Sequence, residues 1–470
     1  MIKKNIRLRD FWILLLAFVI SRLIVISLGI RMNIGPLYAY WQYLDLETLR
    51  HHLLRGVWFD HAQPPVFNLF LGLMLKVFGS RSLLAFAVSF KIISLINGLL
   101  LMSIVRKITH SPFLPLLLSL AYLLSPATLI YECELFYTSF ISLLLLISVY
   151  FLIRIPGKSS WSNTIGFFLP LVLLGLTRSV YHILWLSAVA GVFLFYFRTK
   201  PVFYKILTAG ILSLLLLGSW YIKNKILFDK LSVSTWIGMT LARNVFHDNE
   251  IKDSSRIEAY GSFSRISLYK KFIDPQFEKK FEGLNDRDLL QEMKNDSFIN
   301  ENNVNYIPVS DLYQKASLAR IRSKPMAYLE NVLQSAIIYF TPATIYSLAL
   351  DRAAKIRTYD LVYSFNLSHF ARGKQQRRIA LTVSAIPKLL IYAFVFFIII
   401  RQALRIRSIS CWNVFILLTI GFVFAISSLF EHYENMRFRF ETEPLFLILA
   451  AQAISILRTR RNRYIKEQPE

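Results

Sequence analysis

The chain has 470 residues, of which 55% are hydrophobic and 15% aromatic, and its mean hydropathy is +0.46. The core of a single water-soluble protein could not bury so much apolar surface. The composition therefore excludes an ordinary water-soluble protein and indicates an integral membrane protein. The net charge of +25 does not indicate nucleic-acid binding, because the basic residues are scattered between apolar segments and form no patch with interleaved aromatic residues.

Apolar segments of roughly the length of a transmembrane helix, about 20 residues or somewhat fewer, recur along the chain. The first has a basic start, and no small-residue cleavage site follows it, so we expect an uncleaved first span. The predicted spans are 11–30, 83–105, 113–130, 136–153, 164–176, 180–197, 206–221, 379–400, 411–430 and 445–457.

Two further segments, 66–78 and 326–339, are ambiguous. If neither crosses, every short basic loop falls on one side together with both termini, as the positive-inside rule requires for the cytoplasmic face. Counting 66–78 as a span would move the basic loops at 106–107 and 154–158 to the outside. We therefore expect an all-α polytopic membrane protein with about ten transmembrane helices, both termini cytoplasmic, external juxtamembrane helices and a small external helical segment.

This topology leaves two long external segments, 31–82 and 223–378. We divide the chain into an amino-terminal transmembrane module (1–222) that includes the external loop 31–82, an external segment (223–378), and a carboxy-terminal transmembrane module (379–470). The charged stretch 251–305 is predicted to form a small helical domain or a partly ordered loop, and 326–339 a helix along the membrane interface. Cys133 and Cys411 fall near opposite faces, so no disulfide is expected.

A group of basic residues in the second external segment is discordant with the positive-inside rule, although long loops translocate largely regardless of charge. Two interpretations stay open: these cations meet an anionic substrate such as a lipid-linked phosphate, or they attract anionic lipid headgroups. The residues are Arg352, Lys355, Arg357, Arg372, Lys374, Arg377 and Arg378.

Asp45 and Glu47 follow the aromatic stretch YAYWQY just outside the first span. A carboxylate held at a membrane surface can serve as a general base, and the alternative is that Asp45 caps a short helix. Glu47 and His51 have a spacing compatible with a divalent metal ion, but no third ligand is identifiable. We therefore assign no metal site and no cofactor.

Five blocks of the sequence resemble, in the same order, those of GT-C membrane glycosyltransferases. That grouping includes protein O-mannosyltransferases, the aminoarabinose transferase acting on lipid A and many bacterial polyprenyl-phosphate-sugar transferases. QPPVFNLFLGLMLKVFG is similar to the family's H/K-P-P-L-Y block with its apolar helix. The others are SPATLIYECELFY, LLGLTRSVYHI, WYIKNKILFDKLSVSTWIGMTLARN and MRFRFETEPLFLILAA.

The resemblance implies transfer of a sugar from a polyprenyl-phosphate donor on the external face, with inversion at the anomeric carbon and without a nucleotide. Asp45 matches the family's catalytic base, and Arg437 and Arg439 match an element that contacts phosphate or headgroup. Gln63 stands where relatives carry His or Lys, so that charged contact is missing or is supplied by His61. Lys223 replaces an arginine, and Asp45 with Glu47 replaces an adjacent Asp-Glu pair.

Further polar residues near the external face are candidates for substrate binding, each with a structural alternative. Asp60 and His61 assist the base or bind the acceptor, or cap the helix that begins at the two prolines. Glu132 and Glu134 bind sugar or acceptor, or are boundary residues, and Arg178 binds substrate or snorkels. The full set is Glu47, Asp60, His61, Gln63, Glu132, Glu134, Arg178, Arg437 and Arg439.

The sequence thus predicts a membrane glycosyltransferase, in a bacterial inner membrane, with an external active site. Its expected partners are the polyprenyl-phosphate sugar, membrane lipids and an acceptor that is a glycan, lipid or protein. The alternatives are a transporter or flippase for a lipid-linked or anionic substrate, and an O-antigen polymerase or ligase. Carriers usually place ionisable residues at mid-membrane between repeated halves, and here Lys91 is the one clear mid-span charge, with no evident repeat.

Overall fold

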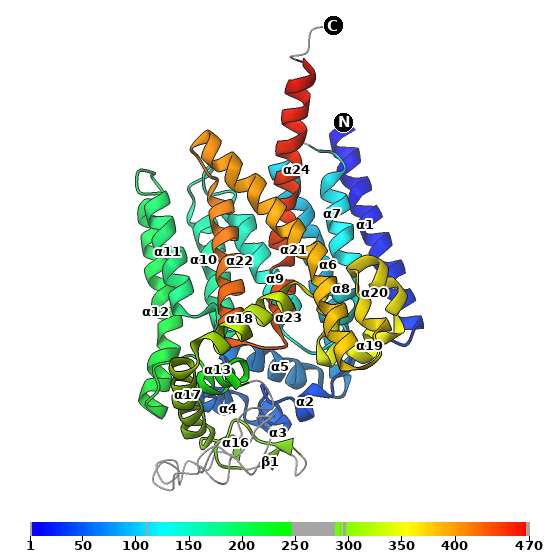
Figure 1. Ribbon diagram of the computed structural model, residues 1–470. Coiled ribbons are helices and arrows are strands. Elements are labelled where there is room, and N and C mark those ends of the chain that lie inside the picture. Colours follow the sequence, from blue (N-terminus) through cyan, green and yellow to red (C-terminus); the bar gives the residue numbers. More distant parts are fainter. Residues whose placement is uncertain (1, 110, 247–286, 292, 295–297, 467–470) are drawn as a thin grey trace.

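The computed structural model describes residues 2–109, 111–246, 287–291, 293–294 and 298–466, and these are almost entirely helical (Figure 1). The predicted helical class is thus confirmed. Two strands of two residues each, β1 (Met293–Lys294) and β2 (Phe298–Ile299), pair in antiparallel fashion. Most of the segment 251–305, with its predicted helical domain, lies outside the described residues.

Five helical stretches are long and apolar enough to cross a membrane, and the chain is therefore an integral membrane protein. They are α1 (Ile2–Ser27), α5 (Pro65–Phe78) continued through η1 (Gly79–Arg81) into α6 (Ser82–Ile108), α12 (Phe203–Phe228), α21 (Gly373–Ile406) and α22 (Cys411–Phe430).

Shorter apolar helices pack among these. They are α7 (Leu114–Leu124), α9 (Thr138–Leu152), α10 (Trp161–Gly175) and α11 (Ile183–Tyr196). A sixth candidate span is α23 (Asn435–Glu441) with α24 (Glu443–Lys466), which are bent by 59° relative to each other.

Each of the ten predicted spans coincides largely with helix, but the span predicted at 113–130 is divided between two helices. Its second part, α8 (Pro126–Tyr131), begins where the Ser125 hydroxyl accepts a hydrogen bond from the Thr128 N–H and Pro126 takes the first helical position. Both features favour a new helix start, so a single straight span is replaced by two helices.

The other helices lie towards the end of the molecule opposite to both chain termini (Figure 1). They are α2 (Pro36–Ala39), α3 (Leu46–His51), α4 (Leu53–Phe59), α13 (Ile237–Phe246), α16 (Arg287–Leu290), α17 (Tyr306–Ser323), α18 (Pro325–Phe340), α19 (Leu350–Lys355) and α20 (Arg357–Ser364), with the short 3-10 turns η2 (Ser179–Tyr181), η3 (Ala343–Ile345), η4 (Ser347–Ala349) and η5 (Leu367–Phe370).

The two ambiguous segments both form helices at this end. α5 starts at its two prolines and stops at Gly79, whose φ of +49° leaves the helical region, and it lies among α2 to α4 (Figure 1). α18 exposes apolar residues at helical spacing, Met326, Leu329, Leu333 and Ile337, whereas Ser335 and Tyr339 are buried. An exposed apolar side on a helix of 16 residues fits the predicted interfacial position.

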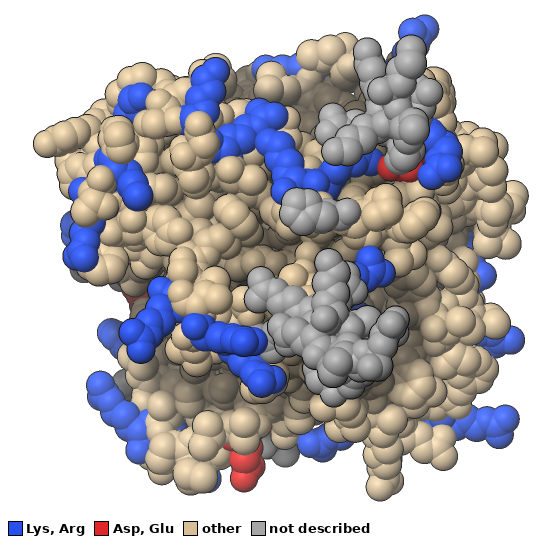
Figure 2. Space-filling model, turned by 90° about the horizontal axis from the view of Figure 1, so that it is seen from above, with Lys and Arg blue, Asp and Glu red and all other residues tan. Residues whose placement is uncertain are grey.

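The end that carries both termini is strongly basic. Figure 2 shows this end, on which Lys and Arg far outnumber Asp and Glu. Exposed cations at the helix ends and connecting loops here include Lys107, Lys158, Arg198, Arg401 and Arg405. The short basic loops therefore share one end of the molecule with the chain termini, as the assignment of the spans predicted.

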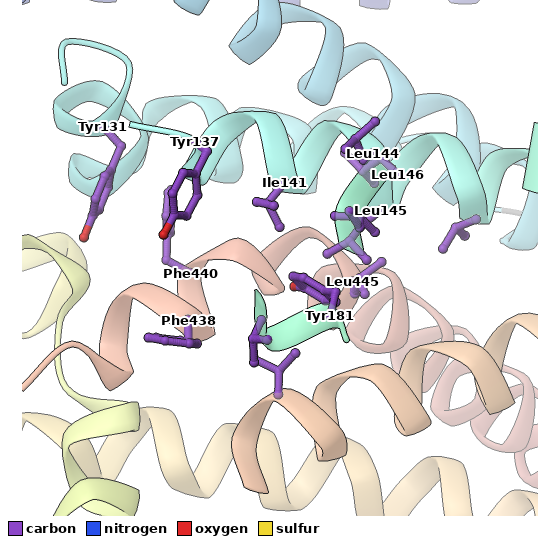
Figure 3. Packing of buried hydrophobic residues seen from close by; sticks show 14 of the residues in the cluster. Tyr131, Tyr137, Ile141, Leu144, Leu145, Leu146, Tyr181, Phe438, Phe440 and Leu445 are labelled. Carbon is purple, nitrogen blue, oxygen red and sulfur yellow. The ribbon is translucent and has the colours of Figure 1, made fainter. Parts of the chain in front are cut away.

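The largest buried cluster runs through the helix bundle from Leu14 to Ala453. Figure 3 shows part of it, where residues of α9 face those of α23 and α24. Tyr131 stacks on Phe440 with ring centroids 5.1 Å apart, and Tyr122 also stacks on Phe440, with ring centroids 6.3 Å apart. This packing fixes α23 against the bundle, and α23 carries part of the site described below.

Gly238 lets α13 approach α17 closely. A Cβ atom at this position would lie 1.8 Å from the Ser310 carbonyl oxygen. We expect Gly238→Ala to lower the free energy of unfolding by about 1–3 kcal/mol, because the two helices must separate. Thermal unfolding in detergent checks this against Gly191→Ala, where no atom lies within 4 Å and little change is expected. Equal melting temperatures for the two variants would contradict the close packing.

Candidate active site

A cavity of about 630 Å³ lies where the segment 31–82 meets the ends of several membrane helices. Its wall combines residues that are far apart in the sequence. Its lining residues include Trp41, Gln42 and Gln63 of this segment, Tyr137, Arg178, Ser179, Val180 and His182 between α10 and α11, Ile183 and Leu184 of α11, Tyr221, Leu231 to Ser234, Trp236, Ile237, Thr240, Phe422, Ile426, Phe430, Glu431, Glu434, Arg437 and Phe438.

The loop before α5 is organised around Asp60. One carboxylate oxygen accepts hydrogen bonds from the N–H groups of Ala62 and Gln63, both at 3.0 Å, and the other accepts from Asn68 Nδ2 at 2.9 Å. The Lys223 ammonium donates to the Asp60 carbonyl oxygen at 2.7 Å. Burial raises the pKa of Asp60 to about 7, against the lowering effect of the Gln63 N–H and Lys223. Asp60 therefore shapes the turn that places Gln63 in the cavity wall.

His61 is buried and faces away from the cavity. Its Nε2 lies 2.9 Å from the Asn302 carbonyl oxygen and its Nδ1 lies 2.8 Å from Thr235 Oγ1. A carbonyl oxygen only accepts, so Nε2 carries the proton and Nδ1 accepts from the threonine hydroxyl. Burial, together with the neighbouring Lys223, lowers the pKa of His61 to about 3. Both ring nitrogens are thus engaged by Thr235 and Asn302, and His61 does not line the cavity, so the structure does not place it where it could supply the charge missing at Gln63.

This burial makes His61 a source of acid sensitivity. The unfolded chain binds a proton at His61 below pH about 6.5, but the folded protein does so only near pH 3, so stability falls as the pH drops through this window. We expect a loss of about 2 kcal/mol at pH 5 from this group, which His61→Gln should remove. Thermal unfolding at pH 7.5 and pH 5 measures it, with exposed His52→Gln as control. The same acid-induced loss in both variants would contradict the assignment.

The polar end of the cavity is formed by two buried arginines. Arg178 forms an ion pair with Glu441, and its guanidinium lies 3.6 Å from the ring centroid of Phe438. Arg437 forms an ion pair with Glu434, and its guanidinium lies 4.3 Å from the ring centroid of Phe136. The side chains of Arg178 and Arg437 are 4% and 2% exposed, so both charges sit in a largely water-free environment.

Some N–H groups of these two arginines are free to donate further hydrogen bonds. Nη2 of Arg178 and Nε of Arg437 are buried and have no hydrogen-bond partner among the described residues. A buried charged donor without an acceptor is costly, and oxygen atoms of an anion would satisfy it. The polar end of the cavity is therefore suited to bind a phosphate or a carboxylate.

Two carboxylates lie beside the arginines. Glu431 is 2.9 Å from Arg243, which also lies 3.5 Å from Glu434. Burial raises the pKa of Glu431 to about 7, opposed by Arg243. Burial also raises the pKa of Glu434, but Arg437 and then Arg243 outweigh this effect and hold the pKa below its usual value. Glu434 thus stays ionised and is committed to its arginine partners.

The other side of the cavity is apolar and partly open. Leu184, Leu231 and Ile237 line it and are 69%, 71% and 49% exposed. They come from α11, from the loop after α12 and from α13, and Phe422 and Ile426 of α22 continue this wall. In a membrane protein such an exposed apolar side faces lipid, so the cavity joins an anion-binding end to a surface fit for a hydrocarbon chain.

Trp41 and Trp236 stack on each other at the cavity wall, with ring centroids 4.7 Å apart. A small second hollow lies behind them and is also lined by Arg243 and Glu301. Burial raises the pKa of Glu301 to about 8. The stacked pair joins the segment 31–82 to the start of α13, which explains how segments nearly 200 positions apart form one wall.

Three of the predicted substrate-binding residues line the cavity: Gln63, Arg178 and Arg437. Asp45 does not. Its carboxylate accepts a hydrogen bond from the Glu47 N–H at 2.8 Å and caps α3, which is the structural alternative considered from the sequence. Glu47 is exposed and also lies outside the lining.

The remaining predicted residues form buried structural pairs away from the cavity. Glu132 makes a bidentate ion pair with Arg22 of α1, at 2.8 Å, and Glu134 pairs with Arg352. Arg439 pairs with Glu443 and donates to the Tyr339 carbonyl oxygen at 2.9 Å. None of the three lines the cavity. The pairs link α1 and the segment 350–355 to the connection after α8, and α23 to α24.

Sequence reasoning missed Trp41, Trp236, His182, Glu431 and Glu434, which do line the cavity. The two glutamates were within reach of sequence reasoning, because they lie within the five residues before the MRFRF block and are spaced to share an arginine. For metal binding, no cluster of three or more His, Cys, Asp and Glu side chains occurs in the described part of the chain.

The five sequence blocks converge on this cavity. Gln63 comes from the first block, Tyr137 from the second, Arg178 and His182 from the third, Trp236 from the fourth, and Arg437 from the fifth. The blocks are spread over most of the chain, and packing alone does not require them to share one wall. The cavity is therefore the candidate functional site.

No model of a known protein family matches the sequence, and no curated protein matches it. Among solved structures, the chain is similar to ArnT from Cupriavidus metallidurans in the apo state. The match has 14% sequence identity and a TM-score of 0.36, and it covers 94% of this chain and 76% of that chain.

Proposed function

We propose that this protein is a membrane glycosyltransferase that transfers a sugar from a polyprenyl-phosphate donor to an acceptor hydroxyl. The observation that carries the proposal is the cavity itself. Arg178 and Arg437, buried and with unmet donor capacity, form its polar end, and an exposed apolar side adjoins it. A lipid-linked phosphate has the same two parts, an anion and a hydrocarbon chain.

In this proposal the two arginines stabilise the leaving group. The acceptor oxygen attacks the anomeric carbon, the bond from that carbon to the phosphate oxygen breaks, and its electron pair leaves with the lipid phosphate. Negative charge builds up on the phosphate, and preorganised buried donors stabilise such charge more strongly than water does. The chain would need no nucleotide for this step.

We propose Asp45 as the general base that takes the acceptor proton. Glu431 and Glu434 are the carboxylates in the cavity wall, but Glu431 is paired with Arg243 and Glu434 with Arg437, an arginine of the leaving-group end. In an inverting displacement the base lies opposite the leaving group, and the first external loop supplies another wall through Trp41 and Gln42. Asp45 belongs to that loop, and the resemblance assigns the base to its position.

The orientation in the membrane is part of the proposal. The basic end with both termini would face the cytoplasm, following the positive-inside rule, and the cavity would open to the external side of a bacterial inner membrane (Figures 1 and 2). With both termini on one side, the chain must cross the membrane an even number of times, and about ten crossings remains our prediction. The division of the chain into three modules is also still a prediction.

The function can be tested by incubating the purified full-length protein with a synthetic polyprenyl-phosphate hexose and a mixture of lipid, glycan and peptide acceptors. Release of polyprenyl phosphate, coupled to sugar on an acceptor, is the expected result. Intact donor that instead appears in the opposite leaflet of proteoliposomes would identify a flippase and contradict the proposal.

A further inference from the structure

A second feature of the external side is distinct from the cavity. Residues 357–378 carry exposed apolar side chains, among them Val362 at 80% and Phe370 at 58% exposure. Five exposed cations accompany them, and none forms an ion pair within the described residues. We name this surface the α20–α21 patch; its cations are Arg357, Arg372, Lys374, Arg377 and Arg378, and its apolar members are Tyr359, Val362, Tyr363, Phe365 and Phe370.

The patch is firmly attached to the ends of membrane helices. Lys355 donates to the Gly29 carbonyl oxygen after α1 at 2.8 Å, and Tyr359 donates to the Leu124 carbonyl oxygen at the end of α7 at 2.6 Å. Arg352 pairs with Glu134 just beyond α8. These contacts place the patch beside the bundle, at the level where the helices emerge.

The patch is also rigid and nearly free of opposing charge. Asp360 is fully buried beneath it, and one of its oxygens accepts from Thr344 at 2.6 Å and from Asn366 at 2.7 Å and contacts His369 Nε2 at 2.8 Å. The one other acid in the described stretch 350–378 is the exposed Asp351. The electrostatic field of the patch is therefore dominated by its cations.

Helix α21 gives the depth of the patch in the membrane. With 34 residues it is about 50 Å long, whereas a hydrocarbon core is about 30 Å thick. Lys374, Arg377 and Arg378 occupy its first turns, ahead of the apolar run that starts at Ile379. The three cations consequently extend beyond the hydrocarbon into the headgroup layer.

From this geometry we infer that the α20–α21 patch binds anionic phospholipid headgroups of the leaflet on the side opposite to the chain termini. The cations meet the phosphates, while Val362, Phe365 and Phe370 enter the boundary between headgroups and acyl chains. The positive charge of the patch and its depth in the membrane favour an anionic phospholipid over a soluble anion, because a soluble anion would make no contact with the exposed apolar side chains. The inference is independent of the proposed glycosyl transfer.

The test compares lipid retention by the full-length protein in native mass spectrometry, after equilibration with mixed phosphatidylglycerol and phosphatidylcholine. Lys374→Gln/Arg377→Gln/Arg378→Gln removes three patch cations. The matched control Lys315→Gln/Arg322→Gln/Lys324→Gln removes three exposed cations at α17 and its carboxy-terminal end. Val362→Ser/Phe370→Ser tests the apolar part, and thermal unfolding verifies that all variants are folded.

We expect wild type and the control to retain phosphatidylglycerol preferentially. The triple patch variant should lose this preference by at least about fivefold, and the serine variant should lose part of it. An unchanged preference in the triple patch variant, or an equal loss in the control, would overturn the inference. Displacement of phosphatidylglycerol by millimolar inorganic phosphate would also overturn it, because it would identify a site for soluble anions.

Discussion

Arg437→Gln is expected to reduce transfer from a polyprenyl-phosphate hexose by at least about 100-fold. The reason is electrostatic: removal of one preorganised donor to a developing oxyanion typically costs this much or more. Arg437 is 1% exposed and lines the cavity, so no water replaces its guanidinium efficiently. The rate of polyprenyl phosphate release by the purified variant gives the measurement.

The single variant also leaves Glu434 as a buried charge without its main partner, which alone would destabilise the fold. The double variant Glu434→Gln/Arg437→Gln removes both charges. We expect the double variant to regain most of the thermal stability lost in the single variant but none of the activity. If transfer returned along with stability, Arg437 would have a structural role and the assignment of the phosphate site would be wrong.

Asp45→Asn is expected to lower transfer by about 100-fold to 10,000-fold, the usual contribution of a general base. This substitution separates a catalytic role of Asp45 from its role as a helix cap. Asparagine caps a helix about as well as aspartate and preserves the hydrogen bond from the Glu47 N–H. The melting temperature should therefore stay the same while the rate falls.

Glu431→Gln is the matched control, since it removes the cavity carboxylate whose pKa burial raises to about 7. We expect this variant to keep transfer within about tenfold of wild type, because Glu431 lies on the side of the leaving phosphate. The reverse pattern, with Asp45→Asn active and Glu431→Gln inactive, would move the base to Glu431. It would also predict a loss of activity below pH 7 in the wild type.

The helices could be predicted from the sequence because apolar runs and their caps are local signals. Every predicted span lies largely on helix, but 113–130 was predicted as one span, although Ser125 and Pro126 are local signals for the start of α8. The 59° bend between α23 and α24 also has a local signal, which the sequence analysis did not use. Pro444 stands in the first turn of α24 and lacks the N–H that a continuous helix would donate to the Phe440 carbonyl oxygen, so the helix breaks at Thr442.

The site was partly predictable. Arg437 and Arg439 were both expected to contact phosphate, but residues two apart on a helix point about 200° away from each other. One faces the cavity and the other pairs with Glu443, as helical geometry requires. The partners of Glu132 and Glu134 could not be foreseen, because Arg22 and Arg352 are 110 and 218 positions away and no local pattern links them.

The most direct test of the central claim is a structure of the full-length protein with a non-transferable polyprenyl-phosphate sugar analogue. We predict that the phosphate oxygens lie within hydrogen-bonding distance of Arg178 and Arg437, with the hydrocarbon chain leaving the cavity past Leu184 and Ile237. A phosphate bound elsewhere, for example at the α20–α21 patch, with the cavity unoccupied, would contradict the account.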